Sequence, residues 1–134
     1  MNQANKFSES LLVASRAILE HRDFKIAARK IFDEARKMTG AQSGYVALLN
    51  DRGDENELLF LESGGLKCTV DPELPMPIRG LRSECYAKKE VVYDNDFMKS
   101  EWEKFMPKGH VVLNNVLFSP LIIEGIVVGI IGLA

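Results

Sequence analysis

Two long apolar runs near the end of the chain place the strongest constraint on the fold. Residues 116–123 and 126–133 consist almost wholly of apolar side chains, and Glu124 and Gly125 separate them. Such a stretch has the length of a membrane-spanning helix, but Pro120, the glycines and the many Ile and Val residues favour strands. We therefore expect two buried central strands of a sheet that is covered on both faces.

The N-terminal segment predicts an amphipathic helix. Apolar side chains recur there at intervals of three and four residues, which is the spacing that lines one face of a helix. This apolar stripe consists of Phe7, Leu11, Ala14 and Ile18, and Leu12 and Leu19 widen it.

A second helix is expected between Asp23, which can act as its N-cap, and Gly40, which can end it. One side of this helix is apolar and the other is charged, so we expect the charged side to face water. The expected apolar face holds Phe24, Ala27, Ala28, Ile31, Ala35 and Met38, and the charged face holds Arg29, Lys30, Asp33 and Glu34.

The middle of the chain predicts a hairpin followed by irregular structure. Residues 45–49 and 58–61 have strand composition, and the turn-forming residues 50–54 lie between them. Residues 63–80 are rich in Gly and Pro and predict a long ordered loop, whose length is itself a hint of function. The elements expected next are a short helix at 81–88, a strand at 91–93, an Asp94-Asn95-Asp96 turn that caps a helix, and that second short helix at 98–106.

Length, net charge and cysteine content exclude several classes of function. The chain has 134 residues, which suits a single domain, and its net charge of −2 gives no electrostatic case for binding nucleic acid or an anionic membrane. The first residues lack the layout of a signal peptide, and two cysteines are too few for a disulfide scaffold. We expect a cytoplasmic protein that contacts neither nucleic acid nor membrane.

Three segments resemble the GAF family: Arg79-Gly80-Leu81, residues 88–94 and residues 119–133. The last is the most specific, because GAF domains commonly carry Pro-Leu at the start of the penultimate strand and a glycine in the final strand. Pro120 and Gly129 match that pattern.

The resemblance implies an α+β fold in which N-terminal helices cover one face of a central antiparallel sheet and short helices and loops form a roof over the other. It implies one GAF domain over residues 1–134, with a linker or dimerisation helix at 1–22 and the core at 23–134. GAF domains usually continue into a C-terminal helix, so we expect that helix to be missing and the chain to be a fragment of a longer signalling protein. Sensor histidine kinases of two-component systems, where GAF domains often adjoin PAS domains, are the expected parent.

The resemblance also implies where a ligand would lie, namely between the sheet and the roof formed by residues 64–110. The aromatic side chains Tyr45, Phe60, Tyr93, Phe97, Trp102, Phe105 and Phe118 are expected to be core or to line this site. The residues expected to touch a ligand are Cys68, Met76, Leu81, Cys85, Tyr93, Trp102 and His110.

Haem is one candidate cofactor, because Cys68 or His110 could supply an axial ligand. The alternative is that Cys68 is a small half-buried side chain and His110 a loop histidine, and the general behaviour of free cysteine and isolated histidine favours it. A bilin is disfavoured, because neither cysteine precedes a histidine.

Three functions remain open. The first is a sensory domain that binds a small molecule and relays binding to an output domain. The second is a ligand-free spacer that dimerises through the stripe around Leu11. The third is an enzyme like the free methionine sulfoxide reductases, which also use a GAF fold. We expect no catalytic residue, because Cys68 and Cys85 lack an identifiable base and do not match that enzyme's motifs.

Overall fold

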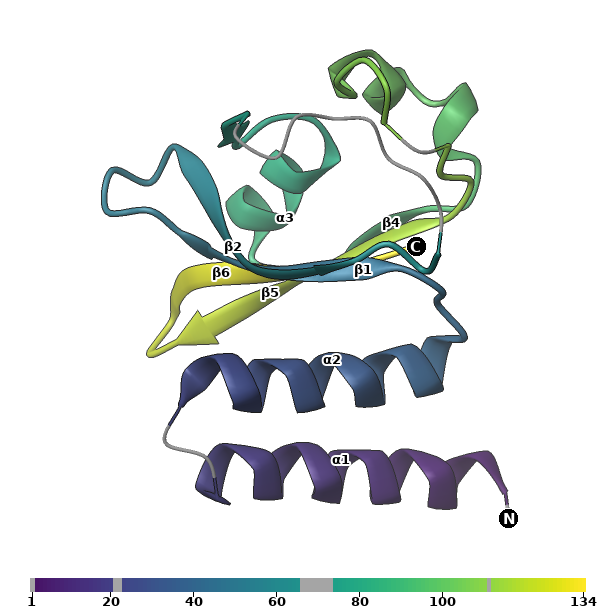
Figure 1. Ribbon diagram of the computed structural model, residues 1–134, viewed down its shortest axis with the longest axis vertical. Helices are drawn as coiled ribbons and strands as arrows, with labels where there is room; N and C mark the ends of the chain where they lie inside the picture. Colours follow the sequence, from purple (N-terminus) through teal and green to yellow (C-terminus); the bar gives the residue numbers. More distant parts are fainter. Residues whose placement is uncertain (1, 21–22, 66–73, 111) are drawn as a thin grey trace. The chain divides into compact units, whose positions relative to one another are not determined.

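The computed structural model describes residues 2–20, 23–65, 74–110 and 112–134. The chain divides into two compact units, Met1–Gln42 and Ser43–Ala134. The first unit holds two helices, α1 (Gln3–Glu20) and α2 (Phe24–Thr39) (Figure 1). The elements of the second unit are β1 (Gly44–Leu49), β2 (Glu55–Glu62), β3 (Met76–Pro77), α3 (Leu81–Lys88), β4 (Val92–Asp94), the 3₁₀ turns η1 (Phe97–Lys99) and η2 (Glu101–Phe105), β5 (Val116–Ile123) and β6 (Ile126–Leu133).

The predicted ends of α2 are confirmed. The Asp23 carboxylate accepts a hydrogen bond from the Lys25 amide at 2.9 Å, which satisfies one of the free N–H groups of the first turn. Gly40 ends the helix in the left-handed region (φ 75°), and its amide donates to the Arg36 carbonyl. Glycine reaches this conformation without steric cost, which explains why the helix stops there.

The predicted faces of α2 need correction. Phe24 was expected on the buried face but is 46% exposed, whereas Phe32 is completely buried. Glu34 was expected to face water but is buried. The Lys37 ammonium lies 2.7 Å from the Glu34 carboxylate, and this partner makes the burial of a charged group tolerable.

The second unit is built on one six-stranded sheet with the order β3-β2-β1-β6-β5-β4, in which every pair of neighbours is antiparallel. The expected hairpin at residues 45–61 is β1 and β2, and the two apolar runs are β5 and β6 in the interior of the sheet. Backbone hydrogen bonds in both directions between Ser43 and Ala134 continue the β1–β6 pairing to the end of the chain. The predicted α+β class with an antiparallel sheet is confirmed; the packing of residues 24–38 on the sheet stays a prediction.

The β5–β6 hairpin explains two residues of the apolar runs. Pro120 lies beyond the last residue that pairs with β4, Phe118, so its missing N–H interrupts no hydrogen bond on that side. Glu124 and Gly125 both have positive φ (49° and 79°), as the turn requires.

The tip of this hairpin corrects the expectation that both strands are covered along their whole length. Ile122, Ile123 and Ile126 are between 45% and 65% exposed there. Apolar composition alone does not distinguish a strand's covered centre from its protruding end.

The roof consists of α3 and the two 3₁₀ turns. The helix expected at 81–88 is α3, whereas the second expected helix is shorter and tighter, because η1 and η2 break at Ser100. Asp96 does not cap η1 with its side chain. Instead the Asp94 carboxylate accepts a hydrogen bond from the Asp96 amide, which is a turn within the Asp-Asn-Asp segment.

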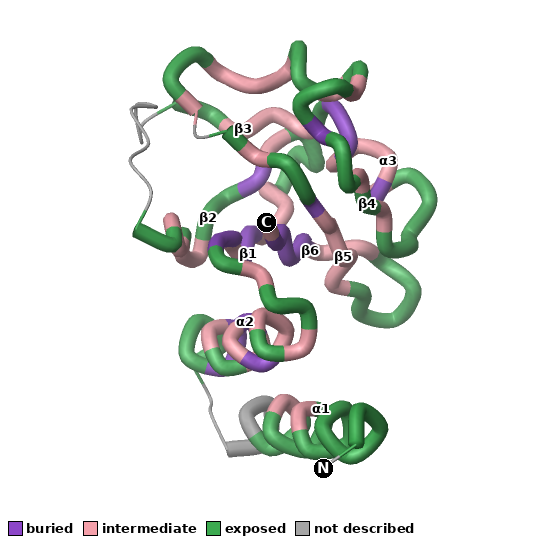
Figure 2. The backbone as a smooth tube through the Cα atoms, turned by 90° about the vertical axis from the view of Figure 1, so that its right-hand side faces the viewer, coloured by how far each residue is buried: buried purple, intermediate pink, exposed green. Residues whose placement is uncertain are grey.

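Two clusters of buried residues attach the roof to the sheet. In the first, Cys85 of α3 packs with Ala47 of β1 and Ile130 of β6. The second joins Leu81 of α3, Phe97 of η1 and Val116 of β5. Figure 2 shows buried backbone along β1 and β6, where the first cluster lies. The residues on this side of the sheet therefore define the face that α3 covers, which we call the roofed face.

Candidate functional site

The residues that the sequence analysis expected around a ligand lie partly in the two buried clusters, which share Val92 and Phe118, and partly nearer the surface. Leu81 and Trp102 belong to the cluster around Phe97, whereas Cys85 lies in the cluster with Ala47. The remaining described members are Met76, half-buried in β3, Tyr93, 66% exposed on β4, and His110, half-buried before β5. Cys68 lies outside the described residues, and the proposed haem ligation by Cys68 or His110 stays a prediction.

Cys85 has the properties of a core thiol. It is 1% exposed, and burial raises the pKa of its thiol to about 11. A cysteine reacts as its thiolate, and at neutral pH this side chain holds its proton. Cys85 therefore contributes packing at the roofed face.

A polar group lies next to this apolar cluster. Tyr86, on α3, donates a hydrogen bond from its hydroxyl to the side-chain carbonyl of Asn56, on β2, at 2.5 Å. One helical turn earlier, the Arg82 guanidinium donates to the Pro77 carbonyl at 3.1 Å. The Arg82 guanidinium also acts on the Tyr45 hydroxyl of β1, whose pKa it lowers. We call Tyr45, Asn56, Arg82 and Tyr86 the polar cluster.

Both phenols of the polar cluster are neutral. Burial raises the pKa of Tyr45, and the positive charge of Arg82 opposes this effect only in part. Burial also raises the pKa of Tyr86 far above its usual range. The hydroxyl groups are therefore available as hydrogen-bond donors and acceptors at every physiological pH.

The amide nitrogen of Asn56 is the unusual atom of the cluster. Asn56 is 5% exposed, and its Nδ2 has no hydrogen-bond partner within the described part of the chain. A buried donor without a partner costs about 1–3 kcal/mol. Such groups are rare in native proteins, and each one calls for an explanation, such as a ligand that completes it.

Glycine at position 132 gives room for the aromatic side chains of the roofed face. Tyr45 and Phe118 lie with ring centroids 6.4 Å apart. A Cβ atom on Gly132 would come within 2.9 Å of the Tyr45 ring and 3.0 Å of the Phe118 ring. The space above Gly132 is therefore occupied by two rings, which join the polar cluster to the apolar one.

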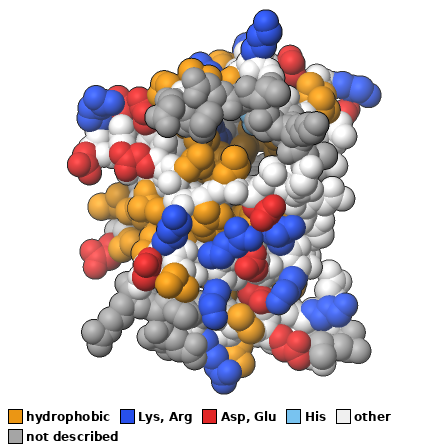
Figure 3. Space-filling model, viewed as in Figure 1, with side chains coloured by type: hydrophobic (Ala, Val, Ile, Leu, Met, Phe, Trp, Pro, Cys, Tyr) orange, Lys and Arg blue, Asp and Glu red, His pale blue; other side chains and the backbone are white. Residues whose placement is uncertain are grey.

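The surface view shows where apolar side chains of the second unit gather. Figure 3 shows hydrophobic side chains gathered around a hollow in the part of the view where Figure 1 places the sheet and its roof. Short elements pack less evenly than long helices, so spaces are expected between them.

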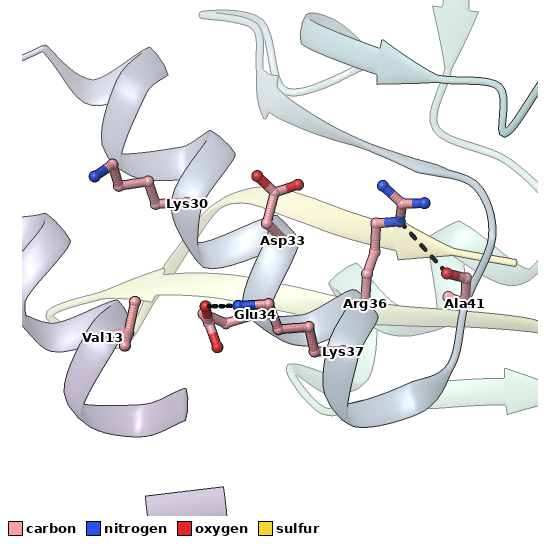
Figure 4. A pocket seen from close by; sticks show the side chains of 7 residues that line it. All are labelled: Val13, Lys30, Asp33, Glu34, Arg36, Lys37 and Ala41. Carbon is pink, nitrogen blue, oxygen red and sulfur yellow. Dashed lines mark hydrogen bonds and ion pairs between the residues drawn. The ribbon is translucent and has the colours of Figure 1, made fainter. Parts of the chain in front are cut away.

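A groove in the helical unit is the other candidate site. It has a volume of about 600 Å³ and is lined by Val13, Lys30, Asp33, Glu34, Arg36, Lys37 and Ala41 (Figure 4). Its charges are mostly satisfied locally, because Arg29 pairs with Asp33, Lys37 pairs with Glu34, and Arg36 donates to the carbonyl of Ala41. The groove is thus explained by helix-surface ion pairs, and we assign it no ligand.

Sequence reasoning missed three members of the polar cluster, Asn56, Arg82 and Tyr86. Asn56 gave no signal, because it is the second residue of β2 and lies outside the strand predicted at 58–61. Arg82 and Tyr86 gave none, because an Arg and a Tyr on a short helix are ordinary surface residues.

Two features are absent from the described residues: a metal-binding group of side chains and a membrane-spanning helix. Residues 2–20, 23–65, 74–110 and 112–134 contain no group of three or more His, Cys, Asp or Glu side chains that could hold a metal ion. The helices described there include none that is long and apolar enough to cross a membrane.

Solved structures with this architecture come from several kinds of protein. The chain is similar to the GAF domain of a phosphoenolpyruvate-protein phosphotransferase from Coxiella burnetii, with a TM-score of 0.76 and 17% identity over 99% of this chain and 79% of that one. It is also similar to the free methionine-R-sulfoxide reductase of Neisseria meningitidis, with a TM-score of 0.73 and 18% identity over 98% of this chain and 73% of that one. A GAF sensor protein from Burkholderia vietnamiensis, described as putative in its name, has a TM-score of 0.68 and 12% identity over 99% and 79% of the two chains.

The sequence comparisons identify a family but no individual curated relative. No curated protein matches the chain. The family model described as the GAF domain matches residues 21–134, which is most of the chain and includes both apolar runs. This match and the antiparallel sheet with its roof agree with the resemblance seen in the Arg79, Lys88 and Ser119 segments, and the chain belongs to the GAF domain family.

Proposed function

We propose that this chain is the sensory domain of a cytoplasmic signalling protein, and that it binds a small molecule at the roofed face of its sheet. The observation that carries the proposal is the buried Asn56 amide, which has an unused donor beside α3. A ligand that accepts a hydrogen bond from this amide stabilises the arrangement of α3 and β2 to which it binds.

The signal would travel as a shift in the population of roof conformations. A ligand that bridges β2 and α3 favours one position of α3, and a neighbouring output domain that senses this position changes its activity. A sensor histidine kinase with adjoining PAS or GAF domains is our proposed parent. We propose no catalytic activity for this chain, because Cys85 is a buried neutral thiol.

Nuclear magnetic resonance tests the site. Mixtures of metabolites are added to isotope-labelled protein, and the expected result is a set of amide shifts confined to residues 56 and 82–86. Glu124 and Gly125, in the exposed hairpin turn, are the internal reference and are expected to stay unchanged. Shifts centred on the groove of the helical unit, or the absence of any hit, would contradict the proposal.

A dimerising spacer is the second candidate, and the exposure of the α1 stripe favours it. Phe7, Leu11 and Leu12 are between 53% and 57% exposed in the single chain. Large apolar side chains gathered on one helix are covered in many signalling proteins by a second copy. The two candidates are compatible, since a homodimer can also bind a ligand.

A further inference from the structure

The polar cluster presents more hydrogen-bond donors than acceptors. Asn56 offers both N–H groups of its amide, because its carbonyl is used by Tyr86. The guanidinium of Arg82 has five N–H groups, of which one donates to the Pro77 carbonyl and another reaches Tyr45. Among the described residues, the Asn56 amide therefore lacks an acceptor.

The cluster also carries a positive charge, that of Arg82. Arg82 is half-buried, and it makes no ion pair with a carboxylate of the described residues. The nearest acid along α3, Glu84, is paired with Lys88 at 3.1 Å. The positive charge of Arg82 lowers the pKa of both phenols, and no described Asp or Glu is among the groups that shift them.

Arg82 and Asn56 can act on one ligand because of where α3 places them. Arg82 and Tyr86 are four residues apart on a helix and lie on the same side of it. Tyr86 reaches Asn56, and Arg82 reaches Tyr45, so the two side chains of α3 span β1 and β2. Beside them lie the apolar Ala47, Cys85 and Ile130.

We propose that this site takes a small organic acid, whose carboxylate accepts hydrogen bonds from Arg82 and from the Asn56 amide and whose apolar part packs toward the cluster around Cys85. The inference rests on the proposed function, since it names the ligand class of the same site. A planar carboxylate matches the fork of a guanidinium, and its single charge balances the single charge of Arg82. A phosphate ester would bring a larger negative charge than one half-buried arginine compensates.

The first experiment measures binding of four probes to the whole chain by fluorine and proton–nitrogen magnetic resonance. These probes are 4-fluorobenzoate, acetate, the neutral 4-fluorotoluene and 4-fluorophenyl phosphate. At least one of the two carboxylates is expected to bind and to shift the side-chain amide signals of Asn56. Asn56→Leu and Arg82→Met are each expected to weaken that binding at least about 10-fold, which is the effect of removing a charge-assisted hydrogen bond.

Arg79→Met is the matched control, because Arg79 lies three residues before Arg82 but is exposed. It is expected to change carboxylate affinity less than about twofold. If 4-fluorotoluene or the phosphate binds at the roofed face more tightly than either carboxylate, the ligand class is wrong while the proposed function stands. If neither these probes nor the metabolite mixtures shift residues 56 and 82–86, both fail.

A double variant separates a binding role of Asn56 from a structural one. Asn56→Leu combined with Tyr86→Phe removes both hydrogen-bonding partners and leaves side chains of similar shape. Without ligand, the melting temperature is expected to equal or exceed that of the wild type, because the orphaned donor disappears together with its neighbour. Loss of carboxylate binding at an unchanged or higher melting temperature supports the proposal. A melting temperature lowered by more than about 5 °C shows that the pair serves stability instead and overturns it.

Discussion

Cys85 of α3 and Asn56 of β2 are both buried at the roofed face, and burial has opposite consequences for their chemistry. The Cys85 thiol packs in an apolar cluster, which makes it unreactive. The Asn56 amide keeps a hydrogen-bond donor for which the described residues provide no acceptor. At the scale of single residues, chemistry in this protein is therefore set by the neighbours that each side chain meets after folding.

The thiol of Cys85 is expected to be unreactive in the folded protein. Because burial raises its pKa to about 11, almost no thiolate exists at pH 8, and the side chain is also inaccessible. The test uses a Cys68→Ser variant, so that Cys85 alone is titrated with Ellman's reagent. We expect less than about a tenth of the thiol to react within minutes in buffer and all of it to react in guanidinium chloride. Rapid reaction of the folded protein would show that the roof opens readily.

Because of Glu34, the free energy of unfolding is expected to fall at acidic pH. The hydrogen bond from Lys37 is the main cause that lowers the pKa of this carboxyl below 4.5. A group whose pKa is lower in the folded state stabilises the fold above its unfolded pKa and loses that effect as the pH falls through the folded value. The wild type should therefore lose more of its free energy of unfolding between pH 6 and pH 3 than Glu34→Gln does, as measured by urea titration. Glu103→Gln, at an exposed position, should behave like the wild type.

At the scale of the elements, the two glycines of β6 predict different costs. In Gly129→Ala the new Cβ would collide with the Ala47 carbonyl oxygen, and this backbone atom cannot move away without shifting the β1–β6 pairing. In Gly132→Ala the contacts are side-chain rings, and these can tilt. We expect Gly132→Ala to lower the free energy of unfolding by about 1–3 kcal/mol and Gly129→Ala to lower it further. Equal midpoints in urea denaturation would contradict the difference between backbone and ring contacts.

At the scale of the whole molecule, the α1 stripe predicts self-association. Phe7→Glu combined with Leu11→Glu introduces charge where two chains would bury apolar surface, so a dimer should dissociate to a monomer. Light scattering at micromolar concentration measures the mass, and circular dichroism checks that helix content is kept. Arg16→Glu, exposed on the opposite side of α1 from Phe7 and Leu11, is the matched control and should leave the mass unchanged. A wild type that is already monomeric would remove the spacer function.

Local sequence signals determined the elements themselves. The boundaries of β5, β6 and α3 were predicted residue by residue, because Gly80 and Gly125 adopt backbone conformations that favour glycine and the polar Glu124 interrupts the apolar runs. The spacing of the apolar side chains likewise predicted α1, and the Pro, Ile and Val content predicted strands in the apolar runs, since both signals depend only on near neighbours in the chain.

The tertiary structure alone decided which of these elements meet. The pairing of β1 with both β2 and β6 places Tyr45 at the centre of the roofed face, and α3 then brings Tyr86 to Asn56 across 30 residues of sequence. Burial was likewise decided by the tertiary structure. Glu34 is buried although it is charged, and Ile126, at the tip of the β5–β6 hairpin, is exposed although it is apolar. Strand order and side-chain contacts depend on pairings between distant residues, and such pairings leave no periodic trace in the sequence. Leu81, Trp102 and Cys85 of the expected ligand residues therefore lie in two clusters that share Val92 and Phe118, while the polar cluster emerged only when the chain was folded.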